Sequence, residues 1–174
     1  MYPLFRLLIS TARAALAQHT TPPDTSEVVF RCRPWDLDTF LEMNNGRILT
    51  LYDLGRFDLA IRSGFLKQLR AQNWGLVVAG GSVRYRKRVR LFDKVTMKTR
   101  ILGHDNRWIY MYQSMWVKGK PCSSLLVRTG VTSKGRTVDT QKVISTMGYE
   151  LPEQTLPDWA GAWIEADNKR PWPP

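Results

Sequence analysis

The pattern of apolar residues along the chain predicts one long, largely buried helix. Between Asn45 and about Gly64, apolar side chains occupy most helix faces and charges are scattered. Asn44 or Asn45 can cap the start of this helix by accepting hydrogen bonds from its unpaired amides, and Gly64 can close its end. A helix that is apolar nearly all round needs to be covered on more than one side.

Five shorter runs, rich in β-branched and aromatic residues, read as strands. They span residues 27–33, 75–89, 94–102, 107–119 and 121–133. Short turns join the last four runs, so the pattern predicts an antiparallel meander. A strongly curved sheet of such strands can wrap around the long helix and cover it. The expected fold class is therefore α+β.

The segment before the first strand predicts an amphipathic helix. Arg6, Ser10 and Arg13 recur at helical spacing, and leucines and alanines can share the opposite side. This reading is favoured over a cleaved signal peptide or a weak membrane anchor, because the apolar run is short and Arg13 interrupts it. Packing on its own domain or on a partner subunit is favoured over peripheral contact with a membrane surface.

These elements divide the chain into three parts. We expect an N-terminal helix and linker over residues 1–26, the helix-and-sheet domain over 27–135, and a C-terminal extension over 136–174. The extension is expected to hold one short helix near Trp159–Glu165. A chain of 174 residues suits a single core of this size.

The composition limits the kinds of binding partner and cofactor that we expect. The formal charge of +11 indicates anionic partners such as phosphorylated ligands, nucleic acid or acidic lipids. Cys32 and Cys122 have no metal-binding or redox spacing, so both are expected to be free thiols in a reducing, cytoplasmic environment. The sequence contains no phosphate-binding glycine loop, no nucleophilic serine elbow and no metal-ligand spacing. We therefore expect no metal and no cofactor.

The stretch "DLDTFLEMNNGR" places two acids, Asp36 and Asp38, just ahead of the long helix. Free amides and the positive end of the helix dipole would favour negative charge at this point. Taken alone, the residues are compatible with an ordinary acidic loop that caps the helix.

Together with the order of elements over residues 27–135, this stretch resembles the hotdog-fold acyl-CoA thioesterases of the 4-hydroxybenzoyl-CoA thioesterase type. The similarity is carried by Asp-Leu-Asp, Met-Asn-Asn-x-Arg and the Asp-x-x-Arg of Asp53 and Arg56. The resemblance implies a hotdog fold, in which a curved antiparallel sheet wraps around a long central helix. It also implies hydrolysis of an acyl-CoA thioester to free acid and CoA, in a homodimer or homotetramer.

Residue by residue, the resemblance assigns the chemistry to Asp38, as nucleophile on the thioester carbonyl or as general base for water. The helix start at Asn45, with Asn44 and Gly46 contacting the substrate, would polarise the carbonyl through backbone amides. Asp53 and Arg56, at positions i and i+3, are expected first of all to pair on one helix face. Asp53 is also the reserve catalytic acid, because in some hotdog thioesterases the working carboxylate lies within the helix.

This chain also departs from the pattern of the family. Leu41-Glu42 stands where many members have Gly-His, and Ile48 stands where they have a tyrosine. Glu42 is either a second reserve acid or an ordinary solvated side chain. The departures keep open a catalytically weak or inactive hotdog protein that binds acyl-CoA or lipid, possibly at a membrane.

The run "SVRYRKRVR" would place Arg84, Arg86, Arg88 and Arg90 on one face of a strand. Arginine binds phosphate through paired hydrogen bonds, so the first three are candidates for binding the phosphates of CoA. A solvated face or ion pairs between subunits would explain the charges equally well. Aromatic residues on nearby strands keep a nucleic-acid-binding module as a less favoured alternative.

Overall fold

The computed structural model describes residues 4–17, 19, 24–148 and 156–172. Part of the expected linker, residues 18 and 20–23, lies outside these ranges. The elements are α1 (Leu4–Leu16), β1 (Ser26–Arg31), the 3₁₀ turn η1 (Pro34–Asp36), α2 (Asn45–Arg62), α3 (Phe65–Ala71), β2 (Gly75–Tyr85), β3 (Lys94–His104), β4 (Ile109–Val117), β5 (Lys120–Ser133), β6 (Arg136–Thr137), α4 (Thr140–Met147) and α5 (Asp158–Lys169).

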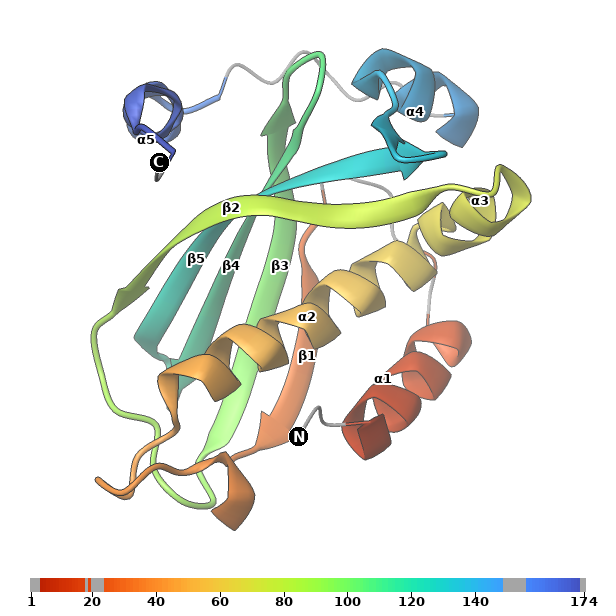
Figure 1. Ribbon diagram of the computed structural model, residues 1–174. Helices are drawn as coiled ribbons and strands as arrows, with labels where there is room; N and C mark the ends of the chain where they lie inside the picture. The colour runs from red at the N-terminus through yellow and green to blue at the C-terminus, as the bar shows by residue number, and fades with distance from the viewer. Residues whose placement is uncertain (1–3, 18, 20–23, 149–155, 173–174) are drawn as a thin grey trace.

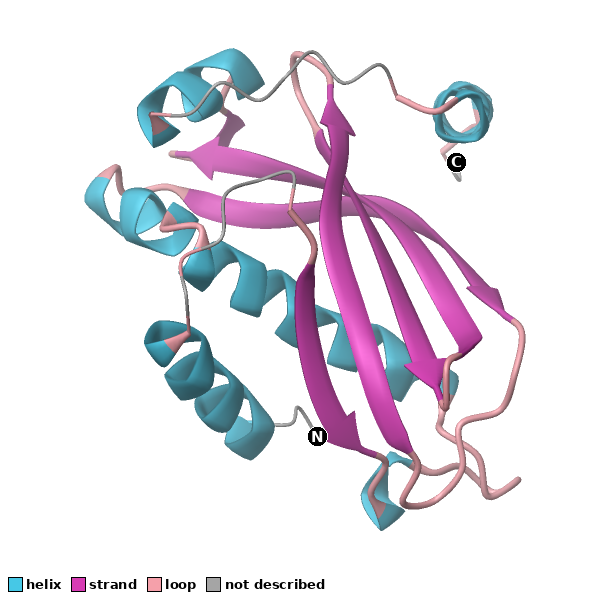
Figure 2. Ribbon diagram, turned by 180° about the vertical axis from the view of Figure 1, so that it is seen from behind, coloured by secondary structure: helices cyan, strands magenta, loops and turns pink. Residues whose placement is uncertain are grey.

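A curved antiparallel sheet wraps around α2, as the resemblance implies (Figure 1). The strand order is β1-β3-β4-β5-β2, and the short β6 pairs with the end of β5. Helix α2 fills the concave side, and α1 packs beside it, next to the β1 edge of the sheet (Figures 1 and 2). The expected α+β fold and the expected double cover of the long helix are confirmed.

The prediction of a four-stranded meander was only partly right. Strands β3, β4 and β5 follow one another as a meander, but β2 pairs with β5 and forms the opposite edge of the sheet. The connection from β2 to β3 therefore has to cross the end of the sheet past β5 and β4. Turn-forming residues between two runs mark a reversal of the chain, and they do not specify which strand becomes the neighbour.

The predicted strand 75–89 is too long. Strand β2 ends at Tyr85, because the amides of Arg86 and Lys87 both turn to the carbonyl of Cys122. Arg86, Arg88 and Arg90 consequently lie in the crossing loop, and the expected row of four arginines on one strand face does not exist.

Side chains alternate between the two faces of the sheet. On β4, Met111, Gln113 and Met115 face α2, whereas Tyr110 and Tyr112 face outward. Helix α5 covers this outer face, and Trp159 packs edge-on against Tyr112 at 5.6 Å between ring centroids. The aromatic residues that could have suggested nucleic-acid binding therefore form a second apolar cluster.

The N-terminal helix is confirmed, but it packs through an unexpected face. Arg6, Leu7 and Ala14 turn toward the domain, while Leu8 and Leu16 are exposed. Arg6 anchors the helix because its guanidinium forms an ion pair with buried Asp36 at 2.7 Å and stacks over Phe30. Among the described residues, no helix combines the length and apolar character needed to cross a bilayer.

Candidate functional site

The start of α2 is capped by Asn44. Its side-chain oxygen accepts a hydrogen bond from the amide of Arg47 at 3.1 Å, and Asn45 is the first helical residue. A side chain on Gly46 would bring its Cβ to 3.2 Å from that capping oxygen, so glycine keeps the cap uncrowded. The first amides of the helix have no partner within it and could hydrogen-bond an oxyanion.

Residues 36–44 fold back on themselves as a narrow hairpin in front of this helix start. The amide of Asn44 donates to the carbonyl of Asp36, and the amide of Asp38 donates to the carbonyl of Glu42. Asp38 therefore lies two residues further out than Asp36, which is about 7 Å at the usual rise along a strand.

The two aspartates of the hairpin have different surroundings. Asp36 is fully buried and forms ion pairs with Arg6 at 2.7 Å and Arg47 at 3.5 Å, so it ties α1 and α2 to the loop. Asp38 is half-buried, and its carboxylate accepts a hydrogen bond from the amide of Phe40 at 2.8 Å. The role expected for Asp38 is not tested by this geometry.

The acidic hairpin and the basic crossing loop meet. Glu42 forms an ion pair with Arg88 at 2.8 Å, and the amide of Met43 donates to the carbonyl of Val89. Arg84 is exposed on the last residues of β2, and Arg86 is exposed just beyond the strand end. The predicted basic residues thus separate into one that pairs with the hairpin and two that are exposed near the end of β2.

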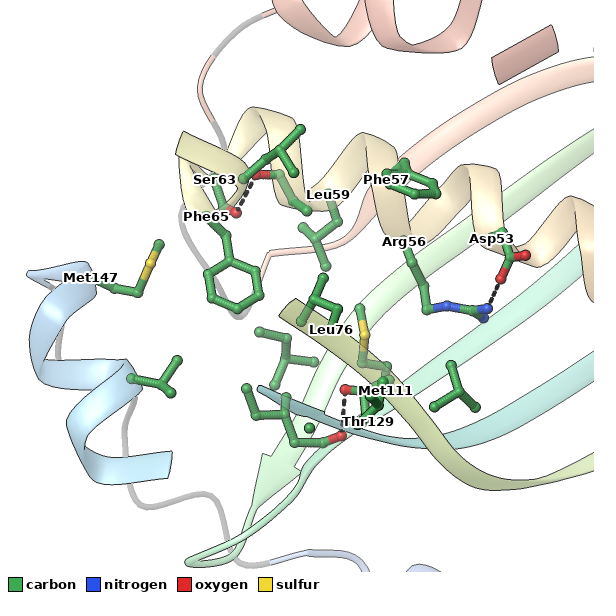
Figure 3. Close-up of a pocket in the computed structure, with 18 of the residues that line it drawn as sticks. Asp53, Arg56, Phe57, Leu59, Ser63, Phe65, Leu76, Met111, Thr129 and Met147 are labelled. Carbon is green, nitrogen blue, oxygen red and sulfur yellow. Dashed lines mark hydrogen bonds and ion pairs between the residues drawn. The ribbon is translucent and has the colours of Figure 1, made fainter. Parts of the chain in front are cut away.

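A separate, largely apolar cavity lies at the other end of α2 (Figure 3). Its volume is about 390 Å³. The walls come from the second half of α2, the start of β2, the centre of the sheet and the short helices α3 and α4; they include Phe57, Ala60, Phe65, Leu76, Met111, Ile144 and Met147. Pockets of roughly 300–1,000 Å³ with such linings commonly hold small ligands.

Asp53 and Arg56 form the polar edge of this cavity and are ion-paired with each other (Figure 3). Burial raises the pKa of the Asp53 carboxyl above its usual range, although the neighbouring Arg56 acts in the opposite direction. Arg56 also donates to the side-chain oxygen of Gln113 at 2.6 Å. Gln113 is fully buried, and its amide donates to Tyr52 and Thr99 at 2.9 Å each.

The same two residues border a second hollow. A groove of about 630 Å³ runs between the first half of α2 and β2, with Asp53, Arg56, Thr50 and Val83 among the residues that line it. Val83 directly precedes Arg84. The cavity, the Asp53–Arg56 pair, the groove and the exposed arginines therefore follow one another along β2.

The structure brings some predicted residues together and separates others. Asp38, Asn44, Asn45, Gly46 and Glu42 gather at the start of α2, whereas Asp53 lies two turns further along the helix. The walls supplied by α3 and α4 were missed from the sequence. For α4 a signal was present, because Asp139 caps the helix by accepting from Gln141 and Gly148 ends it with a left-handed backbone.

Comparison with known proteins gives the family. Residues 32–164 match the thioesterase-like superfamily. The chain is similar to the protein THEM6 of Drosophila melanogaster, with 32% identity over 146 residues, which are 82% of this chain and 74% of that protein. It is also 36% identical over 80 residues to THEM6 of Xenopus laevis, a match that spans 46% of this chain but only 39% of the frog protein.

Solved structures share the fold at low sequence identity. The probable thioesterase YbaW of Escherichia coli superposes with a TM-score of 0.65 at 17% identity, covering 70% of this chain and 95% of the bacterial one. A thioesterase of Thermus thermophilus, complexed with coenzyme A and Zn, superposes with a TM-score of 0.56 at 20% identity. The superposition covers 72% of this chain and 96% of the Thermus chain. With a hotdog fold and a family match over most of its length, this chain belongs to the thioesterase-like superfamily.

Proposed function

We propose that the protein is an acyl-CoA thioesterase that hydrolyses an acyl-CoA thioester to the free acid and CoA. The observation that carries the proposal is the apolar cavity with the Asp53 carboxylate at its edge. Membership of the thioesterase-like superfamily supports the reaction type. The likeness in fold to a thioesterase that binds coenzyme A supports the ligand class.

The cavity would hold the acyl chain. Its lining is dominated by aliphatic and aromatic side chains. The hydroxyl of Thr129 also lines it, but it already donates a hydrogen bond of 2.9 Å to the carbonyl of Ile109. Each methylene transferred from water to such a lining contributes about 0.8 kcal/mol. The thioester at the end of the acyl chain would then lie beside Asp53 and Arg56.

In this arrangement Asp53 serves as the general base. It takes a proton from a water molecule as the water oxygen attacks the carbonyl carbon, and the carbonyl oxygen gains negative charge. Arg56 lies where it can stabilise that charge, because the carboxylate of Asp53 and the side-chain oxygen of Gln113 fix its guanidinium. The C–S bond then breaks, and the CoA sulfur leaves with the proton that Asp53 returns.

The start of α2 is the alternative centre for the chemistry. There Asp38 would be the nucleophile or the base, and the amides of Asn45 and Gly46 would polarise the carbonyl, as the resemblance implies. The geometry favours Asp53, because Asp53 borders both the cavity and the groove, whereas the Asp38 carboxylate accepts a hydrogen bond from Phe40 within its own hairpin. Glu42 is a weaker candidate because Arg88 pairs with it.

The groove along β2 would hold the remainder of CoA. It leads from Asp53 to Val83, and the exposed Arg84 and Arg86 follow at the end where the CoA phosphates would lie. Arg88 is a poorer phosphate ligand than the other two, since Glu42 already neutralises it.

We also infer a homodimer. Strand β2 is an edge of the sheet, and its Leu76, Val77 and Val78 are exposed. An exposed apolar edge strand presents unpaired backbone groups that a second copy can cover. Because the cavity and the groove both reach this strand, pairing there would enclose the site.

A panel of acyl-CoAs of increasing chain length, with release of the CoA thiol as the readout, tests the function. Turnover that rises with chain length to an optimum is expected. Ala60→Met, which fills the cavity, should shift the optimum to shorter chains, while the matched Ala12→Met on the exposed side of α1 should not. Saturable binding without turnover would instead identify a binding protein that lacks hydrolytic activity.

A further inference from the structure

Two neighbouring loops lie at the end of the molecule opposite α3 and α4 (Figures 1 and 2). Both loops carry exposed apolar side chains. One loop is the hairpin before α2, and the other is the crossing loop from β2 to β3. We call the following five residues the loop tips: Trp35, Phe40, Leu41, Leu91 and Phe92. Their exposed fractions range from 40% for Leu91 to 77% for Phe40.

Backbone contacts hold the two loops together. Glu42 and Arg90 form a β-bridge, and these residues directly adjoin Leu41 and Leu91. The amide of Phe92 donates to the carbonyl of Cys32 at 3.0 Å, in the segment that leads into the hairpin. The loop tips therefore belong to one surface with a fixed arrangement.

Two of the tips have an unusual backbone. Leu41 has a φ of 58° and Phe92 a φ of 63°, in the left-handed region that bulky side chains rarely adopt. Asparagine and glycine suit this region better, so turn geometry alone does not account for a leucine and a phenylalanine here. Strained residues that the surrounding structure holds in place often mark a functional contact.

The surface around the tips is basic. Segments 31–47 and 84–94 together contain nine Lys and Arg residues and four Asp and Glu residues, which leaves +5 of the +11 total. Asp36 is buried in ion pairs and Glu42 is paired with Arg88. The exposed cations near the tips include Arg33, Lys87, Arg90 and Lys94.

The shape of this surface favours a flat partner. None of the loop tips lines the cavity, the groove or a third hollow between α1 and β1. Peptides and small ligands bind in concave sites, whereas exposed aromatic and aliphatic side chains flanked by Lys and Arg suit the headgroup region of a bilayer. The basic residues would face acidic headgroups.

We propose that this end of the molecule docks on an anionic lipid bilayer, with the loop tips inserted at the boundary between headgroups and acyl chains. The proposal does not depend on thioesterase activity, because it uses none of the residues assigned to the thioester or to CoA. It also differs from contact through α1, whose exposed Leu8 and Leu16 lie on another element.

The test is co-sedimentation of the full chain with vesicles of phosphatidylcholine alone or with about 30% phosphatidylserine, at physiological salt. Wild type is expected to bind the anionic vesicles. Leu41→Asn/Phe92→Asn should weaken that binding about tenfold or more through lost apolar insertion. Its fold should persist, because asparagine tolerates the left-handed backbone. Lys87→Gln/Arg90→Gln should reduce the preference for the anionic vesicles.

Two control variants test whether vesicle binding depends on the loop tips in particular. Lys134→Asn changes another residue of positive φ, in the turn between β5 and β6 at the other end of the molecule, and should bind like wild type. Leu8→Ser/Leu16→Ser removes apolar side chains of α1 and should also retain binding. Wild type that does not bind, binding lost only in the α1 variant, or a dimer that dissociates in Leu41→Asn/Phe92→Asn would each overturn the proposal.

Discussion

Arg56 on α2 donates a hydrogen bond of 2.6 Å to the side-chain oxygen of Gln113, which is fully buried on β4. Strand β4 thereby holds the guanidinium of Arg56 at the edge of the apolar cavity. Gln113 is itself held because its amide donates to Tyr52 and Thr99. The orientation of the Asp53–Arg56 pair is thus set by a contact with the sheet, through Gln113, as well as by the ion pair within α2.

Replacing Gln113 tests this support. Gln113→Leu removes the acceptor for Arg56 and leaves the hydroxyl of Thr99 and the carbonyl of Tyr52 without their donor. The free energy of unfolding should fall by about 1–3 kcal/mol, the usual cost of unpaired buried polar groups. Chemical denaturation measures it, with Gln141→Leu on the exposed side of α4 as a control expected to lie within about 0.5 kcal/mol of wild type. If Gln113→Leu leaves the free energy of unfolding unchanged, the network contributes little to stability.

Gly55 provides a second test of the packing between α2 and the sheet. A Cβ at this position would overlap the hydroxyl of Thr99 and crowd Gln113 and Met97. Gly55→Ala should therefore destabilise the protein by about 1–3 kcal/mol through overpacking, although alanine is the better helix former. Gly161→Ala in α5 meets no neighbouring atom and should stabilise by up to about 1 kcal/mol. If Gly55→Ala and Gly161→Ala change the free energy of unfolding equally, the close packing of Gly55 against the sheet is contradicted.

The sequence was sufficient for the long helix and the strands because each has a strong local pattern. The period of apolar residues and the cap at Asn44 define α2 within two residues of its predicted end. The pairing of β2 with β5 could not be read in this way, since its partners, from Tyr85↔Ser123 to Gly75↔Thr132, are 38 to 57 residues apart and do not depend on local periodicity.

The site was harder to predict than the fold. The motif around Asp38 and Asn45 was visible because its residues are contiguous, and the structure places them together. The cavity draws on seven elements, among them α3 and α4, and no local signal indicates that these will converge. Asp53 was singled out only as a reserve candidate, because its position at the cavity edge is a property of the folded chain.

The exposed edge of β2 predicts the oligomeric state. Val78 is 59% exposed on this edge, and lysine there should disfavour pairing with a second copy through charge repulsion. Light scattering of wild type should give about twice the chain mass of 20.1 kDa, and Val78→Lys should give a mass near the monomer. A wild type that is monomeric at micromolar concentration would refute the inferred dimer.

The raised pKa of Asp53 has a consequence for stability. The folded state binds the Asp53 proton more tightly than the unfolded chain, so ionisation of this group opposes folding. Its contribution to stability falls as pH rises from the usual Asp pKa of about 3.9 through the raised value. Asp53→Asn should therefore gain thermal stability relative to wild type across this window and keep the gain above it. Melting temperatures of both proteins over a pH series provide the measurement, and a variant less stable than wild type at neutral pH would contradict the direction of the pKa shift.

The turnover number of Asp53→Asn, compared with Asp38→Asn on the same acyl-CoA, tests the central claim most directly. Asparagine keeps the size of the side chain but removes the base, and general-base catalysis typically contributes about 10²–10⁴-fold. Asp53→Asn should lose turnover in this range while acyl-CoA binding persists, and Asp38→Asn should fall by less than about tenfold. If Asp38→Asn loses the larger factor and Asp53→Asn keeps wild-type turnover, the chemistry lies at the start of α2 and the assignment to the cavity edge is wrong.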